Sequence, residues 1–193
     1  MELIGLFLIA AGLLVVAGIA KAVRPGDTAR AMGALLPSLP SLPSPPSLRL
    51  LRYVVRVGAL TEAALGAAAL VFPRPATATL VAASYFGFFG VVAYARRRGG
   101  PIATCGCFGR PDTPPTALHL VIDIVLALAA VAVSAGAPSR GTLVTQLVHQ
   151  PWAGLPLLFV SVVGLWLTAL ALSALAALTS ARRQARPLPV RPS

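Results

Sequence analysis

The sequence predicts an all-α, polytopic membrane protein, a helix bundle with a four-helix core and a fifth transmembrane helix. Hydrophobic residues make up 57% of the chain and charged residues only 11%, against roughly a quarter charged in soluble domains. The mean hydropathy is +0.84. Apolar runs of about 18 residues, the length that crosses a bilayer core, recur along the chain. This composition excludes an ordinary soluble domain.

Five apolar segments are long enough to span a membrane. They cover about residues 3–20, 51–72, 76–95, 116–135 and 154–178. Their content of Leu, Ala, Val and Gly is typical of helices that pack closely in lipid. Basic residues follow the first segment and do not precede it, so we expect an uncleaved anchor there and not a signal peptide. We expect residues 1–180 to form one transmembrane domain.

The connections between the segments differ in character. Residues 36–46 form a Pro/Ser-rich tract, which predicts an extended linker because proline lacks a backbone donor and prevents continuous helix. Pro73 and Pro75 stop one helix and start the next, so the second and third segments should be antiparallel neighbours. Residues 181–193 are basic and of low complexity, which predicts a disordered tail.

The net charge of +11 indicates membrane topology and not a nucleic-acid partner. Thirteen basic residues lie in or beside the first loop, the third loop and the tail, whereas Arg74 and Arg140 alone occupy the second and fourth loops. Basic residues collect in cytoplasmic loops. We therefore predict a multi-pass protein of the cell membrane, with the N-terminus outside and the C-terminus in the cytoplasm.

Four ionisable side chains interrupt the apolar segments. Glu62 stands near the middle of the second segment and should face the bundle interior, because a lipid-facing carboxylate is costly. His119 and Asp123 are four residues apart and share a helix face. Arg56 lies at a depth similar to that of Asp123, which predicts an ion pair between them. The alternative is that these groups only stabilise the bundle, or that Arg56 snorkels to the interface.

Cys105 and Cys107 are the only cysteines and stand one residue apart, just before the fourth segment. Two adjacent thiols can form a strained disulfide, exchange electrons with another dithiol, or bind a soft metal ion. Gly106 and Gly109 give the backbone freedom to turn tightly around the pair. His119 should lie in the first turn of the next helix, where an imidazole near the thiols would favour thiolate. Two inert, buried cysteines are the alternative.

Three stretches resemble the methylamine utilisation protein MauE family, relatives of the DoxX-like membrane proteins. They are the Cys-Gly-Cys-Phe-Gly motif at 105–109, the glycine and lysine that end the first helix at 17–21, and the glutamate-bearing stretch at 60–66. The resemblance covers roughly residues 3–135. It implies a membrane component of a disulfide-handling system that acts with a thioredoxin-like partner in the maturation of exported proteins. The chain has Ile122-Asp123 where many members carry an Arg-Asn pair.

We therefore expect a thiol–disulfide redox protein without a cofactor. Cys105 and Cys107 would be the redox pair, His119 would tune the thiolate, and Glu62 would be a buried proton-handling or structural group. Cys105, Cys107 and His119 also suit a soft-metal site for Cu(I), Hg(II) or Zn. A non-catalytic membrane scaffold is the third hypothesis. Positive-inside counting puts the cysteines on the cytoplasmic side, whereas exported proteins mature outside.

Overall fold

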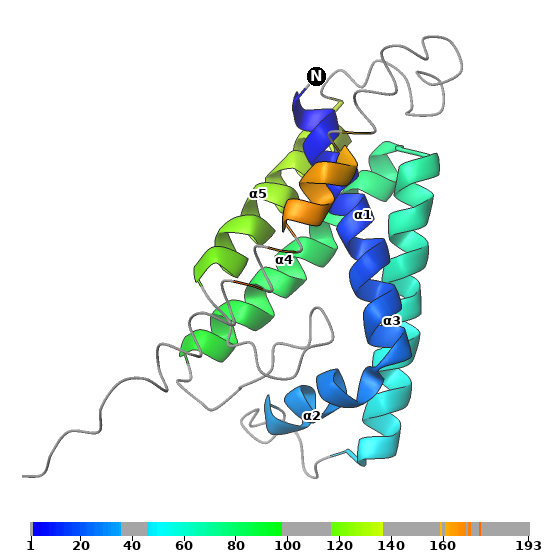
Figure 1. The fold of residues 1–193 in the computed structure, drawn as a ribbon, viewed down its shortest axis with the longest axis vertical. Helices are drawn as coiled ribbons and strands as arrows, with labels where there is room; N and C mark the ends of the chain where they lie inside the picture. Colours follow the sequence, from blue (N-terminus) through cyan, green and yellow to red (C-terminus); the bar gives the residue numbers. More distant parts are fainter. Residues whose placement is uncertain are drawn as a thin grey trace, which may run out of the picture.

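The computed structural model describes residues 2–35, 46–97 and 117–136, together with 159, 161–168, 170 and 174. Every regular element in this part of the chain is a helix, and it contains no strand. The elements are α1 (Glu2–Val23), α2 (Pro25–Leu35), α3 (Leu48–Val71), α4 (Pro75–Arg97) and α5 (Ala117–Ser134) (Figure 1). The all-α prediction is confirmed for these residues.

Four of these helices are long and apolar enough to cross a membrane. The candidate spans are Ile4–Val23, Leu48–Val71, Pro75–Tyr94 and Ala117–Ser134. They coincide with the first four segments predicted from hydropathy, with ends that differ by a few residues. The membrane-bundle prediction is thus confirmed for four helices.

A fifth transmembrane helix is not shown, because most of residues 154–178 lie outside the described residues. Within that range, residues 161–168 are helical. This short piece packs on α1: a Cβ added to Gly164 would lie 2.6 Å from Cδ1 of Ile9, and one added to Gly12 would lie 3.3 Å from Cδ2 of Leu165. Most of the Pro/Ser-rich tract and the whole tail at 181–193 also lie outside the described residues.

The ends of α3 and α4 follow from local sequence. Ser47 caps α3, since its hydroxyl accepts a hydrogen bond from the Leu50 backbone N–H at 3.3 Å. Pro75 occupies the first position of α4, where its missing N–H costs nothing. The Thr77 hydroxyl accepts from the Arg74 N–H at 3.0 Å and fixes this start. The predicted stop and restart around Pro73 and Pro75 are therefore confirmed.

A short helix in the first loop, α2, was not predicted. Its local signals are Pro25 at the first helical position and Asp27 in the first turn. Figure 1 shows α2 lying across the ends of α1 and α3, not along the bundle. Ala29 is fully buried and packs in one cluster with Leu51 and Val55 of α3. This contact fixes α2 to the beginning of α3.

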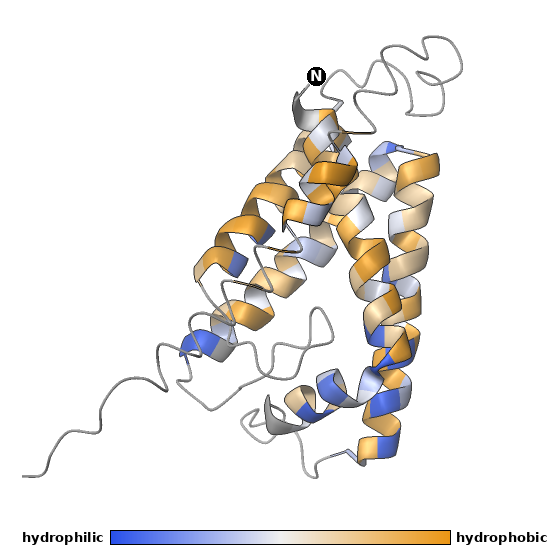
Figure 2. Cartoon of the chain, in the orientation of Figure 1, coloured by the Kyte–Doolittle hydropathy of each residue, from blue (hydrophilic) through white to orange (hydrophobic). Residues whose placement is uncertain are grey.

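The main core lies among the four long helices. α1 packs against α3 and against α5, and α4 packs against α5. The largest fully buried side chains are Phe7 and Leu14 of α1 and Val81 of α4. Many exposed side chains on the long helices are apolar, and Figure 2 shows these helices coloured mostly as hydrophobic. Exposed apolar side chains on every long helix fit a surface covered by lipid.

Candidate functional site

Cys105 and Cys107 lie in segment 98–116, outside the described residues. This segment joins the last residue of α4, Arg97, to the first residue of α5, Ala117. The two cysteines thus follow α4 and precede α5 in the chain. The rest of the candidate site consists of described residues.

A partly buried ion pair joins α1 to α3. The ammonium group of Lys21, in the last turn of α1, binds the Glu62 carboxylate at the middle of α3. The Lys21 side chain is only 10% exposed and that of Glu62 is 23% exposed. The prediction that Glu62 faces the interior is confirmed. Its partner was missed, although the family motif at the end of the first helix includes this lysine.

Two glycines explain why these charges meet. A Cβ added to Gly18 of α1 would lie 2.6 Å from the Ala59 carbonyl oxygen and 2.7 Å from the Ala63 nitrogen of α3. One added to Gly66 of α3 would lie 2.6 Å from the Ala11 carbonyl oxygen of α1. Close approach of two helix backbones is the use that membrane proteins make of small residues. We call this contact, from Gly18 to Gly66, the glycine seam.

Two aromatic residues of α4 support the lysine from its other side. The Lys21 nitrogen lies 4.8 Å from the centroid of the Phe88 ring, within the range of a cation–π contact. Phe88 meets Tyr85 edge to face, with centroids 5.8 Å apart. The buried Tyr85 hydroxyl donates a hydrogen bond of 2.8 Å to the Ala10 carbonyl oxygen of α1. These contacts fix the position of Lys21 between α3 and α4.

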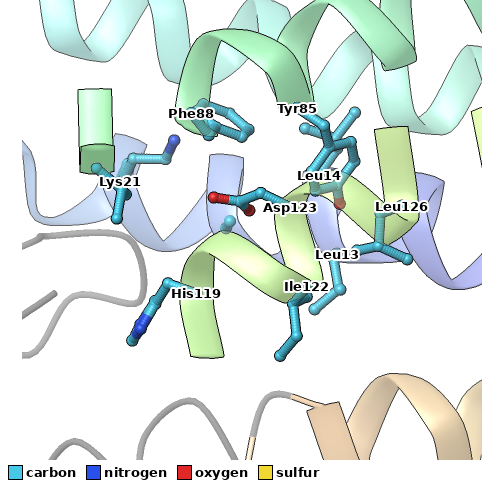
Figure 3. Close-up of a pocket in the computed structure, with 11 residues that line it drawn as sticks. Leu13, Leu14, Lys21, Tyr85, Phe88, His119, Ile122, Asp123 and Leu126 are labelled. Atoms are coloured by element: carbon cyan, nitrogen blue, oxygen red, sulfur yellow. The ribbon is translucent and has the colours of Figure 1, made fainter. Parts of the chain in front are cut away.

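A pocket opens beside Lys21 between α1, α4 and α5. Its polar lining comes from Lys21, Tyr85, His119 and Asp123, and Figure 3 shows the Asp123 carboxylate pointing into it. Its apolar lining consists of Leu13, Leu14, Ala17, Phe88, Val92, Ile122 and Leu126. These residues come from the second half of α1, from the middle and second half of α4, and from the first half and middle of α5. The pocket thus extends from the middle of the bundle toward the end where α4 finishes and α5 begins.

His119 is the third residue of α5, which confirms its predicted place in the first turn. The side chain is buried, with 7% exposure, and lines the pocket next to the turn that carries Asp123. It is also two residues from the point where the cysteine segment joins α5. Among the proposed site residues, His119 is therefore the described group closest to the cysteines along the chain.

The predicted Arg56–Asp123 ion pair is wrong. Arg56 donates from Nε to the Ala22 carbonyl oxygen, 3.3 Å away at the end of α1. Asp123 instead lines the pocket with Lys21, and it belongs to neither of the two ion pairs among the described residues. The reason is helix packing, because α1 packs against both α3 and α5, whereas α3 and α5 are not extensively packed against each other.

The metal hypothesis rests on residues that the structure covers only in part. Among the described residues, no group of three or more His, Cys, Asp or Glu side chains is placed to hold a metal ion. Of the three ligands predicted from the sequence, His119 alone is described. The soft-metal alternative therefore depends on Cys105 and Cys107.

Comparison with known proteins yields one match. A family model described as "Methylamine utilisation protein MauE" matches residues 2–136. This range contains α1 to α5, the glycine seam, the pocket and the cysteine segment. No curated protein and no solved structure matches the chain.

Proposed function

The chain belongs to the methylamine utilisation protein MauE family of membrane proteins, and we propose that it transfers electrons between its own cysteine pair and a thioredoxin-like partner. Cys105 and Cys107 are the redox pair. The protein would support the maturation of exported, disulfide-containing proteins. The observation that carries this proposal is that the only two cysteines of the chain stand one residue apart, inside the range that the family model matches.

The proposed step is a thiol–disulfide exchange. The thiolate of one cysteine attacks the disulfide of the partner, which forms a mixed disulfide and releases one partner thiolate. The second cysteine then attacks the mixed disulfide and releases the other partner thiolate. The chain's two thiols are oxidised to a disulfide, and the partner's disulfide is reduced to two thiols. The protons lost by the attacking thiols balance those taken up by the leaving thiolates.

We assign different roles to the two other proposed site residues. His119, buried at the beginning of α5, is the group that would favour the thiolate. Glu62 holds Lys21 at the edge of the pocket, so the ion pair supports a structural role for it over proton handling. The test uses single-cysteine proteins, Cys107→Ser or Cys105→Ser. Adding His119→Gln to either of them should shift the pH at which the remaining thiol reacts with an alkylating probe. An unchanged profile in a well-folded protein would remove His119 from the site.

Trapping of the mixed disulfide tests the exchange itself. With Cys107→Ser, the intermediate between Cys105 and the partner cannot be resolved, so it should accumulate and be released by a reductant. Cys105→Ser is the matched variant for the other thiol, and the double Cys→Ser protein is the blank. If neither single variant captures a partner and the double variant keeps full function, the chain is a scaffold and the redox proposal fails.

A soft-metal site remains the second candidate, because two thiols and the imidazole of His119 are suitable ligands for Cu(I) or Zn. Metal analysis of the purified protein separates the two functions. A stoichiometric metal that is lost in Cys105→Ser would favour this candidate.

We also propose that the N-terminus lies outside and the C-terminus in the cytoplasm. A reporter fusion that placed the C-terminus outside would contradict this topology.

A further inference from the structure

A second concentration of charge lies where α1, α2 and α3 meet, and we propose that it binds the headgroup of an anionic phospholipid. It consists of four exposed arginines, Arg24, Arg49, Arg52 and Arg56, which we call the basic rim. The proposal is independent of the redox chemistry. It rests on the membrane-spanning helices and on the charges around α2.

Contacts bring the guanidinium groups of α3 to the junction of α1 and α2. Arg56 reaches the Ala22 carbonyl oxygen at the end of α1, with a distance of 3.3 Å from its Nε. Nε of Arg52 lies 3.9 Å from the position that a Cβ on Gly26 of α2 would take. Arg24 itself lies between α1 and α2. At least three of the arginines therefore belong to one local surface.

The basic rim is not neutralised by carboxylates of the described residues. Asp27, the acidic residue of α2, pairs with Arg30, and Glu62 pairs with Lys21. Neither of these two ion pairs includes a basic-rim arginine. A guanidinium group presents a planar fork of donors that matches the oxygens of a phosphate. A cluster of such groups without carboxylate partners is complementary to a phosphate-bearing ligand.

The depth of the basic rim matches the headgroup layer of a bilayer. α3 has 24 residues and is about 36 Å long, whereas the hydrocarbon core is about 30 Å thick. The excess is about one helical turn, and it belongs at the start of α3, because Arg49 and Arg52 lie there whereas the last turn of α3 contains no charged residue. This places Arg49 and Arg52 at or near the interface. Arg56 follows one turn deeper, and its contact with Ala22 directs the side chain toward the end of α1. Figure 2 shows hydrophilic residues on α2 and these turns of α3.

Apolar side chains beside the basic rim favour a lipid over other anions. Val23 and Tyr53 are each 69% exposed, and Val57 is 46% exposed one residue after Arg56. These side chains offer contact to acyl chains next to the arginines, and an interfacial tyrosine is typical of a membrane boundary. A nucleic acid or a free phosphate would use the charges but not the apolar surface. Basic clusters at helix ends are known to recognise anionic lipids.

Lipid titration of the full chain tests the proposal. We would measure binding of phosphatidylglycerol and phosphatidylcholine to the detergent-solubilised protein by native mass spectrometry. At about 1 kcal/mol for each arginine, Arg52→Gln with Arg56→Gln should weaken phosphatidylglycerol binding about 30-fold. Binding of phosphatidylcholine should not change. The matched control is Arg74→Gln, an exposed arginine at the opposite end of α3, which should leave both affinities unchanged.

Further variants protect the test against misfolding. Arg49→Gln with Arg52→Gln keeps the Arg56 contact and should give a similar loss, whereas Arg52→Lys with Arg56→Lys should retain most of the binding because the charge remains. Equal loss in Arg74→Gln, or equal affinity for the two lipids, would overturn the proposal. So would competition by glycerol phosphate at the affinity of the lipid, which would indicate a simple anion site. Binding of polyglutamate without a response to lipid would assign the surface to an acidic protein and also overturn it.

Discussion

The two sides of Lys21 differ in helix packing and in the pairing of their acidic residues. On the α3 side, the glycine seam brings two helix backbones into contact and Glu62 neutralises the ammonium group. On the α4 and α5 side, Asp123 lines a pocket and belongs to neither described ion pair. A closed contact serves stability, whereas a pocket lined by polar groups offers room for chemistry. We infer that the first side is structural and the second functional.

The largest effect should come from breaking the ion pair in the glycine seam. Glu62→Leu leaves the buried Lys21 without its carboxylate, which typically costs about 3–5 kcal/mol. We expect a large drop in the melting temperature of the detergent-solubilised protein. The double variant Lys21→Met with Glu62→Leu should recover most of this loss, because it removes both charges. A stable Glu62→Leu single variant would show that the pair contributes little.

The glycine seam itself should be sensitive to a single methyl group. Gly18→Ala places a Cβ 2.6 Å from the Ala59 carbonyl oxygen, and overpacking of this kind costs about 1–3 kcal/mol. Gly58→Ala is the matched control, since a Cβ there meets nothing within 4 Å. We expect the melting temperature to fall in Gly18→Ala and to stay unchanged in Gly58→Ala. Equal melting temperatures of the two variants would contradict a close helix contact at Gly18.

Tyr85→Phe removes one hydrogen bond from the aromatic support beside the pocket. The lost hydroxyl donates to the Ala10 carbonyl oxygen, and a neutral hydrogen bond contributes about 1 kcal/mol. The ring and its contact with Phe88 are kept. A modest decrease in melting temperature, smaller than that of Gly18→Ala, is expected; a change as large as that of Glu62→Leu would show that the hydroxyl has a further role.

Asp123→Asn should change stability least. The substitution keeps the shape of the side chain and removes a charge that lies in neither described ion pair. We expect the change in stability to be smaller than that of Tyr85→Phe, because no described ion pair is lost. If the pocket is functional, the same variant should still alter the pH at which Cys105 or Cys107 reacts with an alkylating probe. Severe destabilisation would place Asp123 with Glu62 among the structural charges and remove the difference between the two sides.

Hydropathy was enough to predict the four long helices, but not which charged side chains contact each other. The four long helices and the interior position of Glu62 follow from apolar runs and from the cost of a charge in lipid. The Arg56–Asp123 prediction failed because depth fixes a residue along the membrane normal and not around the bundle. Gly18 and Gly66 were the signal for which helices pack together, because they allow the backbones of α1 and α3 to come into close contact. α2 was missed because it has only 11 residues and lacks the length of a membrane span.

The redox state of the cysteine pair in intact membranes tests the central claim most directly. Free thiols would be labelled with a mass-adding maleimide after treatment with an oxidant, a reductant or neither. Our account predicts that the full chain takes no label after oxidation and two labels after reduction. Each single Cys→Ser variant should take one label as long as its remaining thiol has not formed a mixed disulfide. Two labels on the full chain under every condition, with a well-folded protein and thiols shown to be accessible, would contradict the assignment of Cys105 and Cys107 as a redox pair.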